Sequence, residues 1–153
     1  MARTFGVSVD VISKTVVTAH ATVITYPRRL LSVAQSLINS GEFAIAVIVA
    51  HVACEVATER VMAAAFTAKG IQDLEKPVKA LLPGRNLGNN RIRKLYTALT
   101  GDAVQNQPFW SKFTISAELR NDIVHGDPVT PTKQNADDSW AACDEFVKHL
   151  KQG

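Results

Sequence analysis

The chain has 153 residues, of which 46% are hydrophobic and 20% charged, and this is ordinary for one globular domain that can bury a core. Its longest apolar run, residues 43–50, is too short to span a membrane, and its first residues lack the pattern of a signal peptide, so no membrane partner is expected. The net charge of +3 is compatible with a nucleic-acid partner, although a solvated basic surface gives the same excess.

Residues 1–26 are expected to form an N-terminal β-rich arm or hairpin. Residues 5–11 alternate between apolar and polar side chains, residues 15–25 are dense in valine, threonine and isoleucine, and Ser13 and Lys14 fit a turn between them. Because an isolated hairpin is marginal in water, it should pack on the helices or on a second subunit. An arm without order or an extra helix is the alternative.

Residues 27–153 are predicted to form a mainly helical, antiparallel bundle. Apolar residues recur at helical spacing between glycine and proline breaks, and they predict helices over residues 26–39, 42–69, 71–82, 91–100 and 109–125, with a last helix that ends near residue 151. The second helix is apolar nearly all round, which indicates the central, buried position. Thr130 or Thr132 can cap the last helix, and Pro77 can disturb the third.

Two cysteines, Cys54 and Cys143, lie in apolar helical settings about ninety residues apart. They are interpreted as buried thiols in a reducing cytoplasm rather than as a disulfide, so a cytoplasmic location is expected. No CxxC pair or histidine-rich cluster indicates a metal, and no cofactor is expected.

The side chains that could carry out catalysis lie near the end of the fifth predicted helix; they are Arg120, Asn121 and His125. Asn121 and His125 share a helix face one turn apart, and the long side chain of Arg120 can reach round to them. A histidine can take a proton from a ribose 2′-hydroxyl or give one to a leaving 5′-oxygen. An arginine can hold a phosphate and stabilise charge on the phosphorus. This set suffices for RNA transesterification without a metal, although one helix supplies a single histidine where two proton-transfer groups are usually wanted.

The run from Arg120 to Gly126 resembles the R-N-x-x-x-H signature of the HEPN superfamily, small all-helical domains that include many RNA-cleaving toxins and defence proteins. The resemblance covers residues 27–151 and also includes the alanine-rich second helix around Glu55. It implies a HEPN-like bundle and a homodimer that shares one RNA-cleaving cleft. The signature match is fairly specific, whereas the match at Glu55 is weak.

The resemblance implies catalytic roles for Arg120 and His125, support from Asn121, and an orienting role for Glu55. The expected function is thus a metal-independent endoribonuclease that leaves 2′,3′-cyclic phosphate and 5′-hydroxyl ends. As a toxin or defence protein it would have RNA as its target and an antitoxin or neutralising protein as a partner. Two alternatives stay open: a non-catalytic module that binds nucleotide, RNA or protein through the dimer cleft, and a purely structural role in which Arg120 pairs with Glu55, Glu118 or Asp122.

Further polar groups have more than one interpretation. His51 and Glu55 are expected to support the site. With Glu59 they form a stripe on the second helix that could hold a metal with His125, although a polar seam against Arg120 fits better. Basic residues in the next helices could bind the RNA backbone or form a solvated face: Arg91, Arg93 and Lys94, with nearby Arg85 and Lys112. The loop at residues 83–88 has two glycines but lacks the lysine of a phosphate-binding loop. Trp110 and Trp140 are interpreted as core residues.

Overall fold

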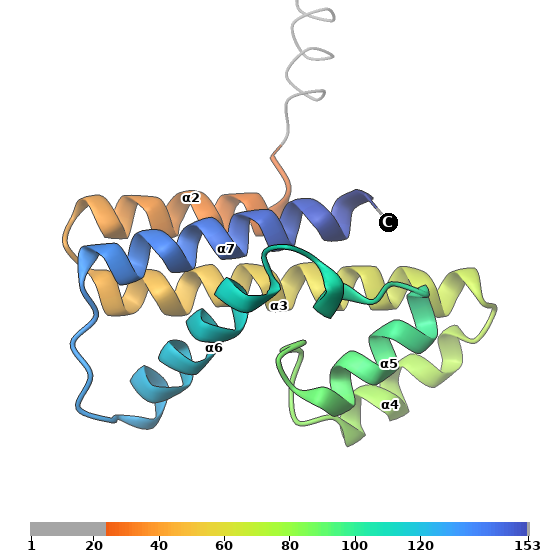
Figure 1. The fold of residues 1–153 in the computed structure, drawn as a ribbon. Helices are drawn as coiled ribbons and strands as arrows, with labels where there is room; N and C mark the ends of the chain where they lie inside the picture. The colour runs from red at the N-terminus through yellow and green to blue at the C-terminus, as the bar shows by residue number, and fades with distance from the viewer. Residues whose placement is uncertain (1–23, 153) are drawn as a thin grey trace, which may run out of the picture.

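The computed structural model describes residues 24–152, and that part of the chain is mainly helical, with no strand in it (Figure 1). Its helices are α2 (Tyr26–Asn39), α3 (Phe43–Ala68), α4 (Glu75–Leu81), α5 (Asn90–Thr100), α6 (Trp110–His125) and α7 (Lys133–Gln152), with short 3-10 turns at Gln72–Leu74 and Val104–Asn106. The mainly helical fold class is therefore confirmed. Most of the β-rich arm expected over residues 1–26 lies outside the described residues, and α2 already begins at Tyr26.

Three long helices, α2, α3 and α7, lie side by side and form the body of the molecule (Figure 1). Pro27 occupies the first turn of α2, where its missing N–H leaves no helical hydrogen bond unmade. Asp144 on α7 links this helix to α2 through an ion pair with Arg28, and it also pairs with Lys148 on its own helix. Burial opposes the charge on Asp144, but hydrogen bonds from Lys148 and Arg28 outweigh it and hold the pKa of this carboxyl below its usual range.

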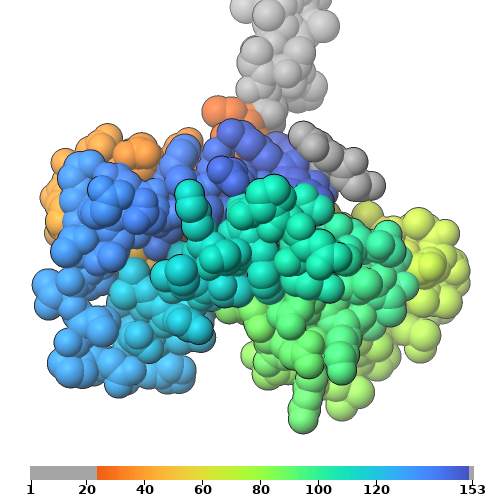
Figure 2. Space-filling model, viewed as in Figure 1, coloured from red at the N-terminus to blue at the C-terminus, as the bar shows by residue number. Residues whose placement is uncertain are grey.

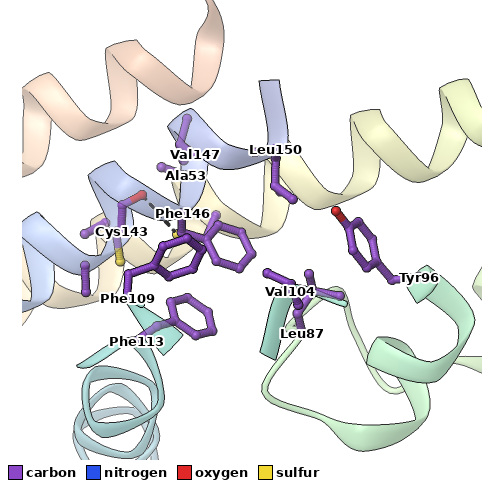
Figure 3. Close-up of a cluster of buried hydrophobic side chains, with 14 of the residues drawn as sticks. Ala53, Leu87, Tyr96, Val104, Phe109, Phe113, Cys143, Phe146, Val147 and Leu150 are labelled. Atoms are coloured by element: carbon purple, nitrogen blue, oxygen red, sulfur yellow. Dashed lines mark hydrogen bonds between the residues drawn. The ribbon is translucent and has the colours of Figure 1, made fainter. Parts of the chain in front are cut away.

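The central helix, α3, is buried on several sides, as its apolar sequence predicts. Small side chains let its neighbours approach closely, and the space beside them is filled by aromatic rings from α6 and α7. Phe113 and Phe146 stack with their ring centres 4.5 Å apart (Figure 3). Cys54 and Cys143 are both buried free thiols within this core, in agreement with their predicted state.

The segment between α3 and α5 differs from the single helix predicted over residues 71–82. It consists of the 3-10 turn followed by the short α4, which begins at Glu75. Pro77 falls in the first turn of α4, where a proline is tolerated, and it therefore marks a helix start rather than a kink. Leu82 is extended because the following Pro83 disfavours helical backbone in the residue before it.

The loop at residues 83–89 leads into α5, whose first turn is capped by the Asn89 side chain. Arg93 on α5 holds this loop: its Nη1 donates to the carbonyls of Leu87 and Gly88, at 3.0 and 3.2 Å. The same guanidinium lies over the ring of Trp110, 5.2 Å from its centre. The loop, α5 and the start of α6 are thus tied to one another by one side chain.

Helix α6 packs on α3 and α7 (Figure 1). Leu119 and Ile123 in its second half still pack against an apolar cluster of α2, α3 and α7, whereas its last two residues, Val124 and His125, are exposed. Gly126 ends the helix in a left-handed conformation, with φ of 77°, which a residue with a side chain adopts at a cost. The Thr132 Oγ1 caps the following α7 by accepting from the backbone N–H of Asn135 at 3.2 Å. Of the two caps proposed from the sequence, Thr132 is therefore the one used.

Candidate functional site

Arg120 lies on α6 and reaches across to α3. Its Nη2 donates to Glu55 Oε1 at 3.3 Å, and its Nη1 donates to Asn121 Oδ1 at 3.2 Å. Both separations exceed the 2.7–2.9 Å typical of a charge-assisted hydrogen bond. The side chains of Glu55 and Arg120 are also 27% and 24% exposed. The expected seam between Glu55 and Arg120 is therefore present, but it is loose and reachable from solvent.

These residues line an open cleft of about 590 Å³ between α6, α3 and the loop at residues 83–89. Figure 2 shows the hollow between the cyan atoms of α6 and the green atoms of the loop and α5. A volume of this size lies in the range of small-ligand pockets. Most of the lining is polar: Glu55, Arg85, Asn86, Asn89, Thr114, Glu118, Arg120 and Asn121.

His125 is the last residue of α6 and is exposed, but it does not line the cleft. Asn121 does, although the two residues share a helix face. One turn of helix carries His125 about 6 Å further along the axis, to the exposed C-terminal end of α6. The signature residues are therefore divided, with Arg120 and Asn121 at the cleft and His125 next to it on the surface.

His51 lies in the core instead of at the cleft. Its side chain is on the inner face of α3, and only 1% of the residue is exposed. The imidazole Nε2 is 2.7 Å from Ser116 Oγ on α6, and the ring packs on Phe113. His51 therefore contributes to the packing of α3 against α6. Across residues 24–152 no three histidine, cysteine, aspartate or glutamate side chains are grouped so that they could hold a metal ion.

The three basic residues singled out on α5 lie in different environments. Arg91 and Lys94 are exposed, whereas Arg93 is occupied by the loop carbonyls and by Trp110. Trp140 donates from Nε1 to the Leu31 carbonyl at 2.8 Å and packs against the core. Both tryptophans pack against the core, as the sequence predicts.

The cleft also contains residues that lie outside the R-N-x-x-x-H motif. Arg85, Asn86 and Asn89 enter from the loop, and Thr114 enters from α6. The signal available in the sequence is the density of arginine and asparagine between residues 85 and 91, which is unusual for a simple connection. Sequence position gives no indication that this loop faces Arg120, because the two are joined only through tertiary contacts.

No known family model, curated protein or solved structure matches this chain. Within residues 24–152, none of the helices combines the length and the apolar character needed to cross a bilayer.

Proposed function

We propose that this protein is a metal-independent endoribonuclease of HEPN type that acts as a toxin or defence protein. The observation that carries the proposal is the placement of Arg120 and Asn121 in an open cleft, with Glu55 beside the guanidinium and His125 one turn further along the same helix. Arginine, asparagine and histidine together supply charge stabilisation, positioning and proton transfer, which suffice for this chemistry.

In the proposed reaction the ribose 2′-oxygen attacks the adjacent phosphorus, and the bond from phosphorus to the 5′-oxygen breaks. The proton of the 2′-hydroxyl passes to a base, and the leaving 5′-oxygen receives a proton from an acid. His125 is the proton-transfer group, Arg120 stabilises negative charge on the phosphoryl oxygens, and Asn121 positions the phosphate. Glu55 orients Arg120. The products are a 2′,3′-cyclic phosphate and a 5′-hydroxyl.

A homodimer completes the proposed site, because each copy of α6 supplies one histidine. In a symmetric pair, the histidine of one copy serves as base while the histidine of the other serves as acid. Val124, the apolar residue next to His125 on α6, is 49% exposed, and a second copy packed against this end of the helix would cover it. An antitoxin or neutralising protein would act by covering the same cleft.

The test is RNA cleavage in excess EDTA with the wild type, Arg120→Ala and His125→Ala. Arg29→Ala is the control, since Arg29 is an exposed arginine on α2, away from the cleft. Cleavage by the wild type and the control only, with cyclic phosphate and 5′-hydroxyl ends, is the expected result. Equal cleavage by all four proteins would identify a contaminating nuclease and remove the proposal.

A non-catalytic module that binds nucleotide, RNA or protein is the second candidate function. It is favoured by the position of His125 outside the cleft, because the groups that bind and the group that moves protons do not meet within one chain. Retention of RNA by a folded wild-type protein that cleaves none of several RNAs would support this candidate.

A further inference from the structure

Three asparagines line the cleft, and the oxygen of each side-chain amide already accepts a hydrogen bond from the protein. Asn86 Oδ1 accepts from the Gly88 N–H at 2.8 Å, and Asn89 Oδ1 accepts from the Arg91 N–H at 2.9 Å. Asn121 Oδ1 accepts from Arg120. Because backbone N–H and guanidinium groups only donate, these contacts fix which end of each amide is used. The carboxamide NH₂ groups have no hydrogen-bond partner within the described part of the chain.

Two arginines add further donors. Arg85 makes a single hydrogen bond among the described residues, from Nη1 to the Gly84 carbonyl at 3.0 Å. The Nε atoms of Arg85 and Arg120 are both buried without a partner among the residues described. Unsatisfied buried donors are uncommon in folded proteins and call for an explanation. A ligand that brings acceptors and draws the two guanidinium groups toward it supplies one.

The carboxylates around the cleft do not neutralise Arg85, so the cleft can bind an anion. Glu55 lines the cleft, but it forms an ion pair with Arg120. Glu118 is exposed on the rim, where water screens its charge. Glu59 lies near Arg85 but is held by Lys79 Nζ at 2.7 Å, and this hydrogen bond lowers the pKa of the Glu59 carboxyl. Arg85 therefore has no carboxylate of its own among the ion pairs of the described residues.

We infer that the cleft seats a backbone phosphate of single-stranded RNA and that Arg85 is an RNA-binding residue. A phosphodiester offers only acceptors and one negative charge, which matches a cleft lined by amide NH₂ groups and guanidinium groups. The inference rests on the proposed function for the identity of the ligand as RNA. It adds a binding position on the loop at residues 83–89, opposite Arg120 and separate from His125.

The experiment is fluorescence anisotropy with a short fluorescein-labelled single-stranded RNA, titrated at several salt concentrations. The proteins are all made in the His125→Ala background, so that the RNA stays intact: the parent, Arg85→Gln, Arg85→Lys and, as a charge-matched control, Arg29→Gln. Circular dichroism verifies that each is folded. Loss of one phosphate contact is expected to weaken the affinity about tenfold, which is about 1.4 kcal/mol.

The salt dependence separates a phosphate contact from a change in folding. For Arg85→Gln the slope of log K against log salt should fall by about 0.7, the value for one contact with single-stranded nucleic acid. Arg85→Lys should keep the slope but lose affinity, because lysine retains the charge without the two-pronged geometry. Arg29→Gln should match the parent in both.

The outcomes distinguish this inference from the proposed function. Arg85-dependent binding by a protein that never cleaves RNA supports the inference and overturns the proposed catalysis. Cleavage by the wild type with unchanged affinity and slope for Arg85→Gln overturns the inference and leaves catalysis standing. The inference is also overturned if the parent does not bind the RNA, or if Arg29→Gln weakens binding as much as Arg85→Gln.

Discussion

A double-mutant cycle on Glu55 and Arg120 tests whether their contact serves folding or the cleft. The variants are Glu55→Gln, Arg120→Gln and the double substitution. Two unit charges about 4 Å apart attract by about 4 kcal/mol at an effective dielectric constant of 20. Exposed pairs retain little of this, because water screens them and holding two long side chains costs entropy.

The structure indicates that the attraction between Glu55 and Arg120 is much weaker than this value. About a quarter of each side chain is exposed, and the 3.3 Å separation is long for such an interaction. We therefore expect a coupling free energy of unfolding below about 1 kcal/mol, which corresponds to a shift of the melting temperature of about 2–4 °C in a domain of this size. Urea denaturation of the four proteins measures it directly.

The same four proteins give a different expectation for RNA cleavage. Glu55→Gln should lower kcat/KM by about tenfold, because a misplaced guanidinium no longer meets the phosphate. The double variant should be no worse than Arg120→Gln, since Glu55 acts only through Arg120. A stability coupling above about 2 kcal/mol would refute this reasoning, because it would show that the ion pair holds α3 to α6 and that Arg120 is not available to a ligand.

Three further outcomes are expected. His125→Ala should change the free energy of unfolding by less than about 0.5 kcal/mol, as for other exposed positions, while it abolishes cleavage; a drop of several kcal/mol in urea denaturation would make the histidine structural. Ser116→Ala should lower the free energy of unfolding by about 1–3 kcal/mol, because it leaves the buried His51 imidazole without its partner. The same substitution should cost less when it is made in a His51→Leu protein; an equal cost in both backgrounds would contradict a role for that hydrogen bond. The pKa of Asp144 is lowered in the folded state, so its charge stabilises the fold above the unfolded pKa of about 3.9 and this contribution disappears as the pH falls through the folded value. Asp144→Asn should therefore lower the melting temperature at pH 7 and lose its effect in strong acid; a difference that stays constant down to pH 2 would exclude linkage to this group.

The predictable part of the fold is the part in which local pattern and tertiary position agree. The sequence of α3 is apolar nearly all round as far as Cys54, and a central position hides such a helix, so its burial could be predicted from the pattern. Gly126 ends α6 as expected because its backbone adopts the left-handed conformation that favours glycine. The buried thiols follow from the apolar setting of each cysteine.

The parts that could not be predicted depend on how helices are rotated about their axes. His51 and Glu55 are one turn apart on α3, yet one is in the core against Ser116 and the other is at the cleft. Spacing places them on one stripe but does not say where the next helix crosses that stripe. The cleft could not be predicted for a similar reason, since its two walls, α6 and the loop at residues 83–89, are brought together only by tertiary packing.

Arg93 gives that wall a property that matters for any ligand. Its bonds to the carbonyls of Leu87 and Gly88 and its contact with Trp110 are made within the protein and need no ligand. The loop therefore loses its conformational entropy when the protein folds, and ordering it does not reduce the affinity for a ligand. A wall that is ordered before binding keeps its shape, so a ligand that fits it binds without the cost of ordering the loop.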